Sequence, residues 1–217
     1  MPKKYEFTGE VHYRFKELKR IRALIDIPRH DVKAGYFGGW ISGEHNLSHL
    51  GDCWVAQSAK INNDAVVYDN AIVRDSAWVY NSAVVKGNAA VSNHARVFEK
   101  AHVGDNALVC DHAQISGEAY LCDYSCTSQD AVVYGNAVIM HAARIYGAAV
   151  LLDNVIVRDN ATVCGNTRAT GYAIIKGNAL ICSDEELALL YIQPSKANIL
   201  TDDIALAQEL VQHYRFK

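Results

Sequence analysis

The stretch "DNAIVRDSAWVYNSAVVKGNAAV", residues 69–91, decides the fold because it repeats one phrase every six residues. Every sixth residue in it is Ala, and Val follows two positions after each Ala. The frame continues without insertion or deletion over 21 hexads, residues 59–184. The exceptions are Thr127 and Ala169 in the aliphatic slot and Ser125, Val155 and Thr167 in the Ala slot. Such a repeat indicates a solenoid, in which each unit buries its apolar side against the next.

Each hexad combines a short strand with a corner. A period of six excludes a single long helix or strand, whereas Ala-x-Val is a short strand with both side chains on one face. Eight corners carry Asn directly before the Ala slot, and each of these Asn follows Asp or Gly. Asp-Asn and Gly-Asn steps enter the left-handed backbone region at low cost, so the chain is expected to turn there.

The phrase "VYDNAIVRDSAWV", residues 67–79, resembles the hexapeptide-repeat proteins, whose units form a left-handed, triangular parallel β-helix. This resemblance implies three hexads in each coil, so that equivalent residues of successive coils stack and the 21 hexads form about seven coils. With strands about 4.8 Å apart, the rod is roughly 34 Å long. We therefore expect a mostly β protein, a single-stranded left-handed parallel β-helix with an N-terminal β cap and C-terminal α-helices.

Stacking predicts three inward columns of mostly aliphatic side chains, with small residues in the corners between them. The first column is Val73, Val91, Val109, Thr127, Ile145, Val163 and Ile181. The second is Val67, Val85, Val103, Leu121, Ile139, Val157 and Ile175. The third is Ile61, Val79, Val97, Ile115, Val133, Leu151 and Ala169.

The two ends lack the hexad frame and are expected to cap the rod within one domain, whose parts are residues 1–55, 56–184 and 185–217. In "LKRIRALIDI" a strand is predicted with Ile21, Ala23, Ile25 and Ile27 on one side. Residues 30–55 are similar to the YdcK-like proteins of the hexapeptide-repeat superfamily. The similarity lies in Asp31-Val32-Lys33-Ala34-Gly35, Gly38-Gly39-Trp40, Asn46-Leu47-Ser48 and Gly51-Asp52-Cys53-Trp54. It implies no particular reaction, but Trp40 and Trp54 can cover the open strand edge.

Two amphipathic helices are predicted after the last hexad. Ser183 and Glu186 have the spacing of a capping box, followed by Leu187, Leu190 and Tyr191 on one face. A second helix over residues 201–216 opens with Thr201 and two aspartates. Its apolar stripe is Ile204, Ala207, Leu210, Val211 and Tyr214. These helices are expected to cap the rod or to pack on a neighbouring subunit.

One outward column predicts a contact between copies of the chain. It consists of Val66, Val84, His102, Tyr120, Val138, Ile156 and Ile174, of which all but the histidine are apolar or aromatic. So much continuous apolar surface is unusual for a monomer, although scattered exposed valines are also common in strands. The superfamily resemblance implies a trimer, and a dimer would bury the same column.

The resemblance also implies a candidate activity, because many hexapeptide-repeat enzymes transfer an acyl group from a thioester carrier such as acetyl-CoA. A histidine then serves as the general base. The candidate here is His141, which occupies a corner slot between the stacked residues Asp123 and Asp159. Flanking carboxylates would raise its basicity and orient the ring. Against this, the histidine can be a solvated turn residue, and no protruding loop interrupts the frame. A binding or structural role is therefore favoured over acyl transfer.

A metal site is a weaker alternative. His94 and His112 stand one coil apart in the repeat and Asp130 lies one coil further, but three ligands in a straight line surround an ion poorly. The six cysteines contain no C-x-x-C pair and are expected to be free thiols of a reducing, cytoplasmic compartment. Cys110, Cys164 and Cys182 share one line, which we attribute to a small-residue slot.

Composition excludes several other classes. The 217-residue chain has a formal charge of −3, which gives no reason to expect a polyanionic partner. In the basic stretch "KELKRIR", residues 16–22, the charged residues alternate as they do on the solvent-exposed face of a strand. Binding of nucleic acid is therefore not expected. No apolar run reaches the length of a membrane span or a secretory signal. An ice-binding surface is excluded because outward threonines are few.

Overall fold

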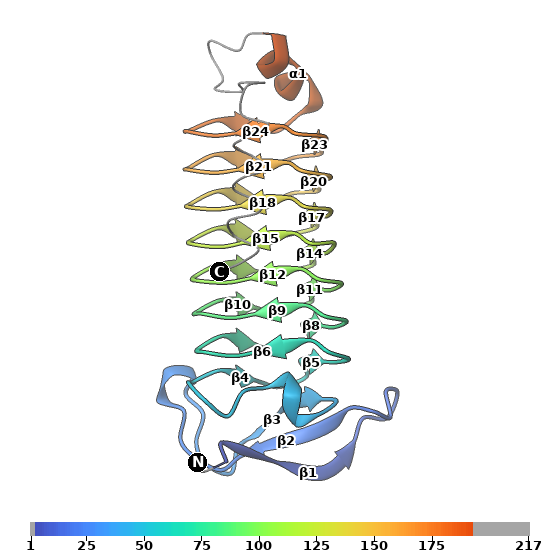
Figure 1. Ribbon diagram of the computed structural model, residues 1–217, viewed down its shortest axis with the longest axis vertical. Coiled ribbons are helices and arrows are strands. Elements are labelled where there is room, and N and C mark those ends of the chain that lie inside the picture. Colours follow the sequence, from blue (N-terminus) through green and yellow to red (C-terminus); the bar gives the residue numbers. More distant parts are fainter. Residues whose placement is uncertain (1–2, 193–217) are drawn as a thin grey trace.

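The computed structural model describes residues 3–192, which form a rod of stacked coils with a β cap at the N-terminal end (Figure 1). Each coil consists of three two-residue strands joined by corners, and corresponding strands of successive coils build three parallel sheets. The described residues contain one α-helix, α1 (Asp184–Ile192), at the other end of the rod. The predicted parallel β-helix is confirmed.

The three sheets take their strands in turn from the hexads. Sheet I contains β5 (Lys60–Ile61), β8 (Trp78–Val79), β11 (Arg96–Val97), β14 (Gln114–Ile115), β17 (Val132–Val133), β20 (Val150–Leu151) and β23 (Arg168–Ala169). Sheet II contains β4 (Trp54–Val55), β7 (Ile72–Val73), β10 (Ala90–Val91), β13 (Leu108–Val109), β16 (Cys126–Thr127), β19 (Arg144–Ile145), β22 (Thr162–Val163) and β25 (Leu180–Ile181). Sheet III contains β6 (Val66–Val67), β9 (Val84–Val85), β12 (His102–Val103), β15 (Tyr120–Leu121), β18 (Val138–Ile139), β21 (Ile156–Val157) and β24 (Ile174–Ile175).

The register between coils is that of three hexads in each coil. In sheet III, for example, Val66 pairs with Val84 and His102 pairs with Tyr120. The same offset already holds at β4, where Trp54 pairs with Ile72. Successive coils therefore place equivalent side chains directly above one another, and the whole repeat extends as columns.

The three predicted inward columns form the core. Every member is at most 3 % exposed, including Thr127 and Ala169, the two residues that depart from the aliphatic pattern. Burying an aliphatic side chain contributes about 1.5–3 kcal/mol before the entropy cost of ordering the chain is subtracted. The continuous apolar prism therefore stabilises strands that are only two residues long.

The corners turn at a residue with positive φ, which confirms the expectation from the Asp-Asn and Gly-Asn steps. Asp69 and Asp105 have φ of 57° and 53°, and Gly87 has 65°. Corner side chains also join adjacent coils, because the Asp69 carboxylate accepts a hydrogen bond from the Gly87 N–H at 3.1 Å. The Asn residues that follow form their own ladder, in which the Asn88 amide donates to Asn106. Both contacts link equivalent positions of adjacent coils and so fix the coil length.

The N-terminal cap extends sheet I with three longer strands. The antiparallel strands β1 (Tyr5–Val11) and β2 (Lys19–Ala23) precede β3 (Phe37–Ile41), which runs parallel to β5. Two short 3₁₀ helices, Pro28–His30 and Glu44–Asn46, lie in the connections around β3. Trp54 is buried under the cap, and a Cβ on Gly38 would lie 2.7 Å from its ring. Glycine there lets β3 pack against the first coil.

The predicted strand in "LKRIRALIDI" is shorter than expected. Ile21 and Ala23 are buried on one side of β2 as predicted, and Ile27 is buried as well. The assignment of Ile25 to that face is wrong, because the strand ends at Ala23 and Ile25 is 42 % exposed. Alternation cannot place a side chain once the backbone bends after the strand.

Helix α1 begins as the capping-box spacing predicts. The Ser183 hydroxyl accepts a hydrogen bond from the Glu186 N–H at 3.2 Å, and the Glu186 carboxylate accepts one from the Cys182 N–H. Leu187 is buried against the last coil. The predicted stripe at Leu190 and Tyr191 and the second predicted helix, residues 201–216, lie outside the part whose side chains are described. No helix within residues 3–192 has the length and apolarity needed to cross a bilayer.

Substitution Ala107→Leu tests the packing of the corners. Ala107 is 1 % exposed, so a larger side chain must displace neighbours in adjacent coils. We expect the free energy of unfolding to fall by about 1–3 kcal/mol, measured by urea denaturation. A denaturation curve that coincides with that of the parent would contradict the core assignment.

Candidate functional site

The corner column around His141 brings together the three residues predicted as a catalytic group. His141 has φ of 57°, so it occupies the same left-handed corner conformation as Asp123 and Asp159. Its backbone N–H donates to the Asp123 carboxylate at 2.9 Å, and its Nδ1 lies 3.0 Å from Asp159 Oδ1. Only Asp159 therefore contacts the imidazole itself, whereas Asp123 contacts the backbone.

His141 also performs the structural task of the other corner residues. The Asp159 N–H donates to His141 Nδ1 at 3.2 Å, just as the Gly177 N–H donates to the Asp159 carboxylate at 2.9 Å. A neutral ring with its proton on Nε2 accepts this bond, whereas a ring with a proton on Nδ1 donates to the Asp159 carboxylate. The Gly177 N–H, together with the His141 side chain, holds the pKa of Asp159 below its usual range. Nε2 has no hydrogen-bond partner within residues 3–192.

A pair of substitutions separates the corner role of His141 from a catalytic one. His141→Asn keeps a side chain that tolerates the left-handed region and can accept the Asp159 N–H, so we expect little change in melting temperature. His141→Val places a β-branched residue at positive φ and removes the acceptor. We expect His141→Val to lose about 1–3 kcal/mol of unfolding free energy relative to His141→Asn. Equal stability of the two variants in urea denaturation would refute the corner role.

The outward column of sheet III divides into two halves. Tyr120 is 8 % exposed, and Val138, Ile156 and Ile174 are at most 3 % exposed, although they point away from the core columns. They form a second apolar cluster with Cys122 and Met140. The three members nearest the N-terminal cap, which we call the lower half of the column, are partly exposed: Val66, Val84 and His102. The lower half of the predicted contact surface is therefore the half that a partner can reach directly.

The weak metal candidates His94 and His112 stack rather than converge. Their ring centroids lie 5.0 Å apart with an interplanar angle of 7°. Both rings, together with Asp130, line a cavity of about 540 Å³ that also contains Asp75 and Asp111. Parallel rings present their nitrogens side by side, so they do not enclose an ion tetrahedrally.

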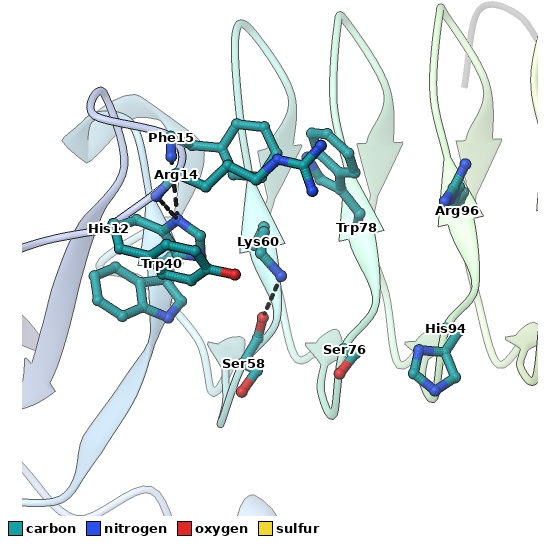
Figure 2. Close-up of a pocket in the computed structure, with 11 residues that line it drawn as sticks. His12, Arg14, Phe15, Trp40, Ser58, Lys60, Ser76, Trp78, His94 and Arg96 are labelled. Carbon is teal, nitrogen blue, oxygen red and sulfur yellow. Dashed lines mark hydrogen bonds between the residues drawn. The ribbon is translucent and has the colours of Figure 1, made fainter.

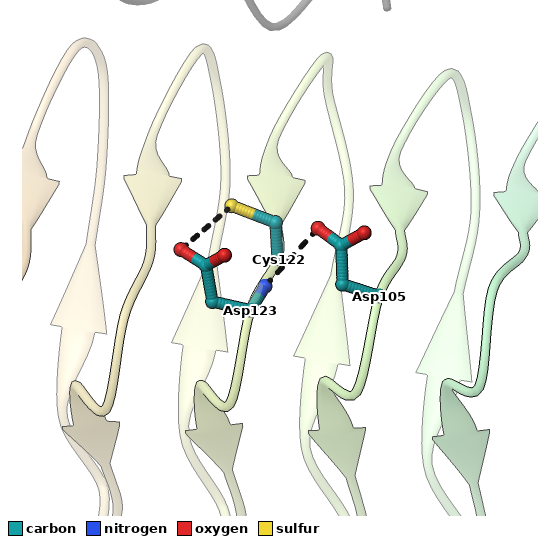
Figure 3. Close-up of side chains that lie close together, drawn as sticks. All are labelled: Asp105, Cys122 and Asp123. Carbon is teal, nitrogen blue, oxygen red and sulfur yellow. Dashed lines mark hydrogen bonds between the residues drawn. The ribbon is translucent and has the colours of Figure 1, made fainter.

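A different group brings metal-ligating atoms closer together, namely Asp105, Cys122 and Asp123 (Figure 3). The ligating atoms of these three residues lie within 4.8 Å of one another. The Cys122 thiol lies 3.8 Å from the Asp123 carboxylate, and the Asp105 carboxylate accepts a hydrogen bond from the Asp123 N–H. Burial, and then the charge of Asp123, raises the pKa of the Cys122 thiol far above its usual range. The Asp105 carboxylate makes the same contact between adjacent coils that the Asp69 carboxylate makes with the Gly87 N–H.

The cysteine column corrects one sequence-based expectation. Cys164 and Cys182, which stack in the last two coils, are joined by a disulfide with a Cα–Cα distance of 4.3 Å. Their alignment is therefore a covalent link between coils and not only the recurrence of a small residue. Cys110, in the same column, is a free thiol, and burial raises its pKa to about 11.

A cavity lined by both aromatic and cationic side chains lies where the N-terminal cap meets sheet I (Figure 2). We call it the junction cavity. It has a volume of about 510 Å³. The turn between β1 and β2 covers it, and outward side chains of β3, β5, β8 and β11 form its base. The lining residues are His12, Tyr13, Arg14, Phe15, Trp40, Ser58, Lys60, Ser76, Trp78, His94 and Arg96.

Two comparisons with known proteins leave the family open. No protein-family model matches the chain, and no curated protein matches it either. The solenoid fold is therefore established by the coils themselves, and the closer YdcK-like likeness stays a resemblance carried by residues 30–55.

The sequence held only part of the signal for the junction cavity. Lys60, Trp78 and Arg96 stand in successive coils and occupy one outward column, so the repeat could have revealed them. Trp40 pairs with Lys60 in the same column. It precedes Lys60 by more residues than one coil contains, so the hexad repeat does not predict this pairing. His12 and Phe15 join the cavity only because the β1–β2 turn folds back over sheet I, which no period predicts.

Proposed function

We propose that this protein is a homo-oligomeric binding and scaffolding protein rather than an enzyme. One observation carries this proposal: His141 Nδ1 lies 3.2 Å from the Asp159 backbone nitrogen, in the position where the Asp159 carboxylate itself meets the Gly177 N–H. The candidate base therefore does the work of an ordinary corner residue. Its side chain is 46 % exposed, so the corner offers little shelter from water for a reacting group.

The homo-oligomer rests on the lower half of the outward column of sheet III. Val66 and Val84 are partly exposed, and burial lowers the pKa of His102, which favours the neutral ring. The His102 ring stacks on Tyr120 with centroids 5.8 Å apart. An apolar strip that ends in neutral aromatic side chains suits a second copy of the same surface.

Light scattering coupled to gel filtration tests the homo-oligomer. We expect a mass two or three times that of the 23.9 kDa subunit at micromolar concentration, and the single-subunit mass for Val66→Asp combined with Val84→Asp. Val132→Asp is the matched control, because Val132 has the same outward slot and a similar exposure on sheet I. A parent protein with the mass of one subunit would refute the homo-oligomer.

A second candidate function is acyl transfer from acetyl-CoA or another acyl-CoA to an amine or hydroxyl. The contact between His141 Nδ1 and Asp159 at 3.0 Å favours it, because a proton held there leaves Nε2 free to act as a base. Acetyl-CoA turnover with a panel of amine and hydroxyl acceptors decides between the two functions. Turnover that is lost in His141→Asn would support the transferase, and its absence in the parent protein would support the binding role.

A further inference from the structure

The junction cavity is walled by aromatic rings from two parts of the chain. Phe15, in the β1–β2 turn, lies against Trp78 with ring centroids 5.1 Å apart. His12, from the same turn, lies edge-on against Trp40 at 4.9 Å. The turn therefore closes over the outward column of sheet I at two points, and Lys60 lies between them (Figure 2). Such walls present flat apolar faces to a planar ring.

The side chains that line the cavity carry positive charge. Arg14, Lys60 and Arg96 line it, and its lining contains no carboxylate. None of these three cations forms a salt bridge within residues 3–192. Among the described residues, the Lys60 ammonium donates only to the Ser58 carbonyl oxygen, at 3.0 Å, and burial lowers its pKa. A half-buried cation without a counter-ion is stabilised by an anion that enters beside it.

The polar atoms of the walls are mainly donors. His12 is 6 % exposed, and its Nδ1 accepts the N–H groups of Arg14 and Phe15, both at 3.2 Å. Burial, followed by the charge of Lys60, lowers the pKa of His12, so the neutral ring carries its proton on Nε2. The indole N–H of Trp78 is buried and has no acceptor among the described residues. The Trp78 N–H can therefore pair with an acceptor that a ligand supplies.

We propose that the junction cavity binds a small aromatic phosphate of the nucleoside monophosphate class. The ring stacks against Trp78, Phe15 or Trp40, and the phosphate meets Lys60, Arg14 and Arg96. A cavity of about 510 Å³ has the size of a small-molecule site. This binding site is independent of the homo-oligomer and of His141, which lies elsewhere on the rod.

The surroundings of the cavity favour a small ligand over a polymer. Beyond Arg96, the outward column of sheet I continues with Gln114 and Val132, which carry no charge. The neighbouring cavity shares Ser76 and His94 with this one but carries three aspartates, Asp75, Asp111 and Asp130. A phosphate chain that left the junction cavity along the corners would meet negative charge.

Calorimetric titration of the full chain at low salt tests the proposal with two probes, AMP and phenyl phosphate. We expect both to bind saturably, and adenosine and inorganic phosphate to bind roughly tenfold more weakly because each supplies half of the contacts. Lys60→Gln combined with Arg96→Gln should weaken AMP by about tenfold or more. Trp78→Leu should weaken phenyl phosphate more than inorganic phosphate.

Arg168→Gln is the matched control, because Arg168 occupies the same outward slot of sheet I at the far end of the rod. Its affinity for AMP should equal that of the parent, and the melting temperatures of all variants verify their folding. The proposal is overturned if neither probe binds at millimolar concentration, or if the double variant binds AMP as well as Arg168→Gln does. Tighter binding of a single-stranded oligodeoxynucleotide than of AMP would overturn it in favour of a nucleic-acid surface.

Discussion

Reduction of the protein is expected to lower its free energy of unfolding by about 3 kcal/mol. The Cys164–Cys182 disulfide closes a loop with a sequence separation of 18 residues, which is one complete coil. Cross-linking a loop of that size removes conformational freedom mainly from the unfolded chain. The link also joins the last two coils, and the last coil stacks on one neighbouring coil only.

Urea denaturation with and without reductant measures this effect in the parent protein. The control is the double variant Cys164→Ser, Cys182→Ser, whose stability should not respond to reductant. Cys110→Ser should keep the full response, because Cys110 is a free thiol in the same column. Alkylation of denatured, unreduced protein should modify only four of the six cysteines. Modification of all six would show that the link does not exist in solution.

The core of this fold could be predicted residue by residue because the repeat fixes the geometry. Once three hexads close a coil, each side chain stands above its counterpart in the preceding coil, and the slot determines whether it points inward. The slot alone predicts that Val109 and Leu121 lie in the core, and both are fully buried. The unbroken frame makes the argument strong, since a single inserted residue would shift every later column.

The sequence does not predict the structure where the hexad repeat ends. It also does not predict contacts that depend on a segment outside the repeat or on the rotation of side chains. Alternation predicts that Ile25 points inward, but β2 ends at Ala23 and Ile25 is exposed. Trp40 lies outside the register of the hexads, so its place beside Lys60 followed only from the packing of the cap. The sequence does not predict the disulfide, because a column shared by two cysteines does not give the distance between their sulfur atoms.

The His141 corner shows how far stacking alone can carry a functional argument. The sequence correctly brought His141 between Asp123 and Asp159, since all three are in the same slot. It could not show that Asp123 binds the backbone N–H or that Nδ1 accepts the Asp159 N–H. Those contacts depend on side-chain rotation, which a repeat does not encode. They are what favours a structural role for this histidine.

Restoring the repeat at two interior positions is expected to stabilise the protein. Ser125 and Thr127 replace Ala and Val in the hexad that contains β16, and both are fully buried. Neither hydroxyl has a hydrogen-bond partner among the described residues. Each unsatisfied buried hydroxyl costs about 1–3 kcal/mol, so Ser125→Ala combined with Thr127→Val should raise the free energy of unfolding by at least about 2 kcal/mol.

Thr167→Ala is the matched control for this gain. Thr167 is also a buried hydroxyl residue in the Ala slot, but its hydroxyl donates to the Cys164 carbonyl oxygen at 2.8 Å. Its replacement removes a satisfied hydrogen bond, so the free energy of unfolding should stay the same or fall by about 1 kcal/mol. Urea denaturation of the three proteins gives the comparison. If the double variant is no more stable than the parent, the two hydroxyls have hydrogen-bond partners in solution. A buried water molecule between the coils would be such a partner.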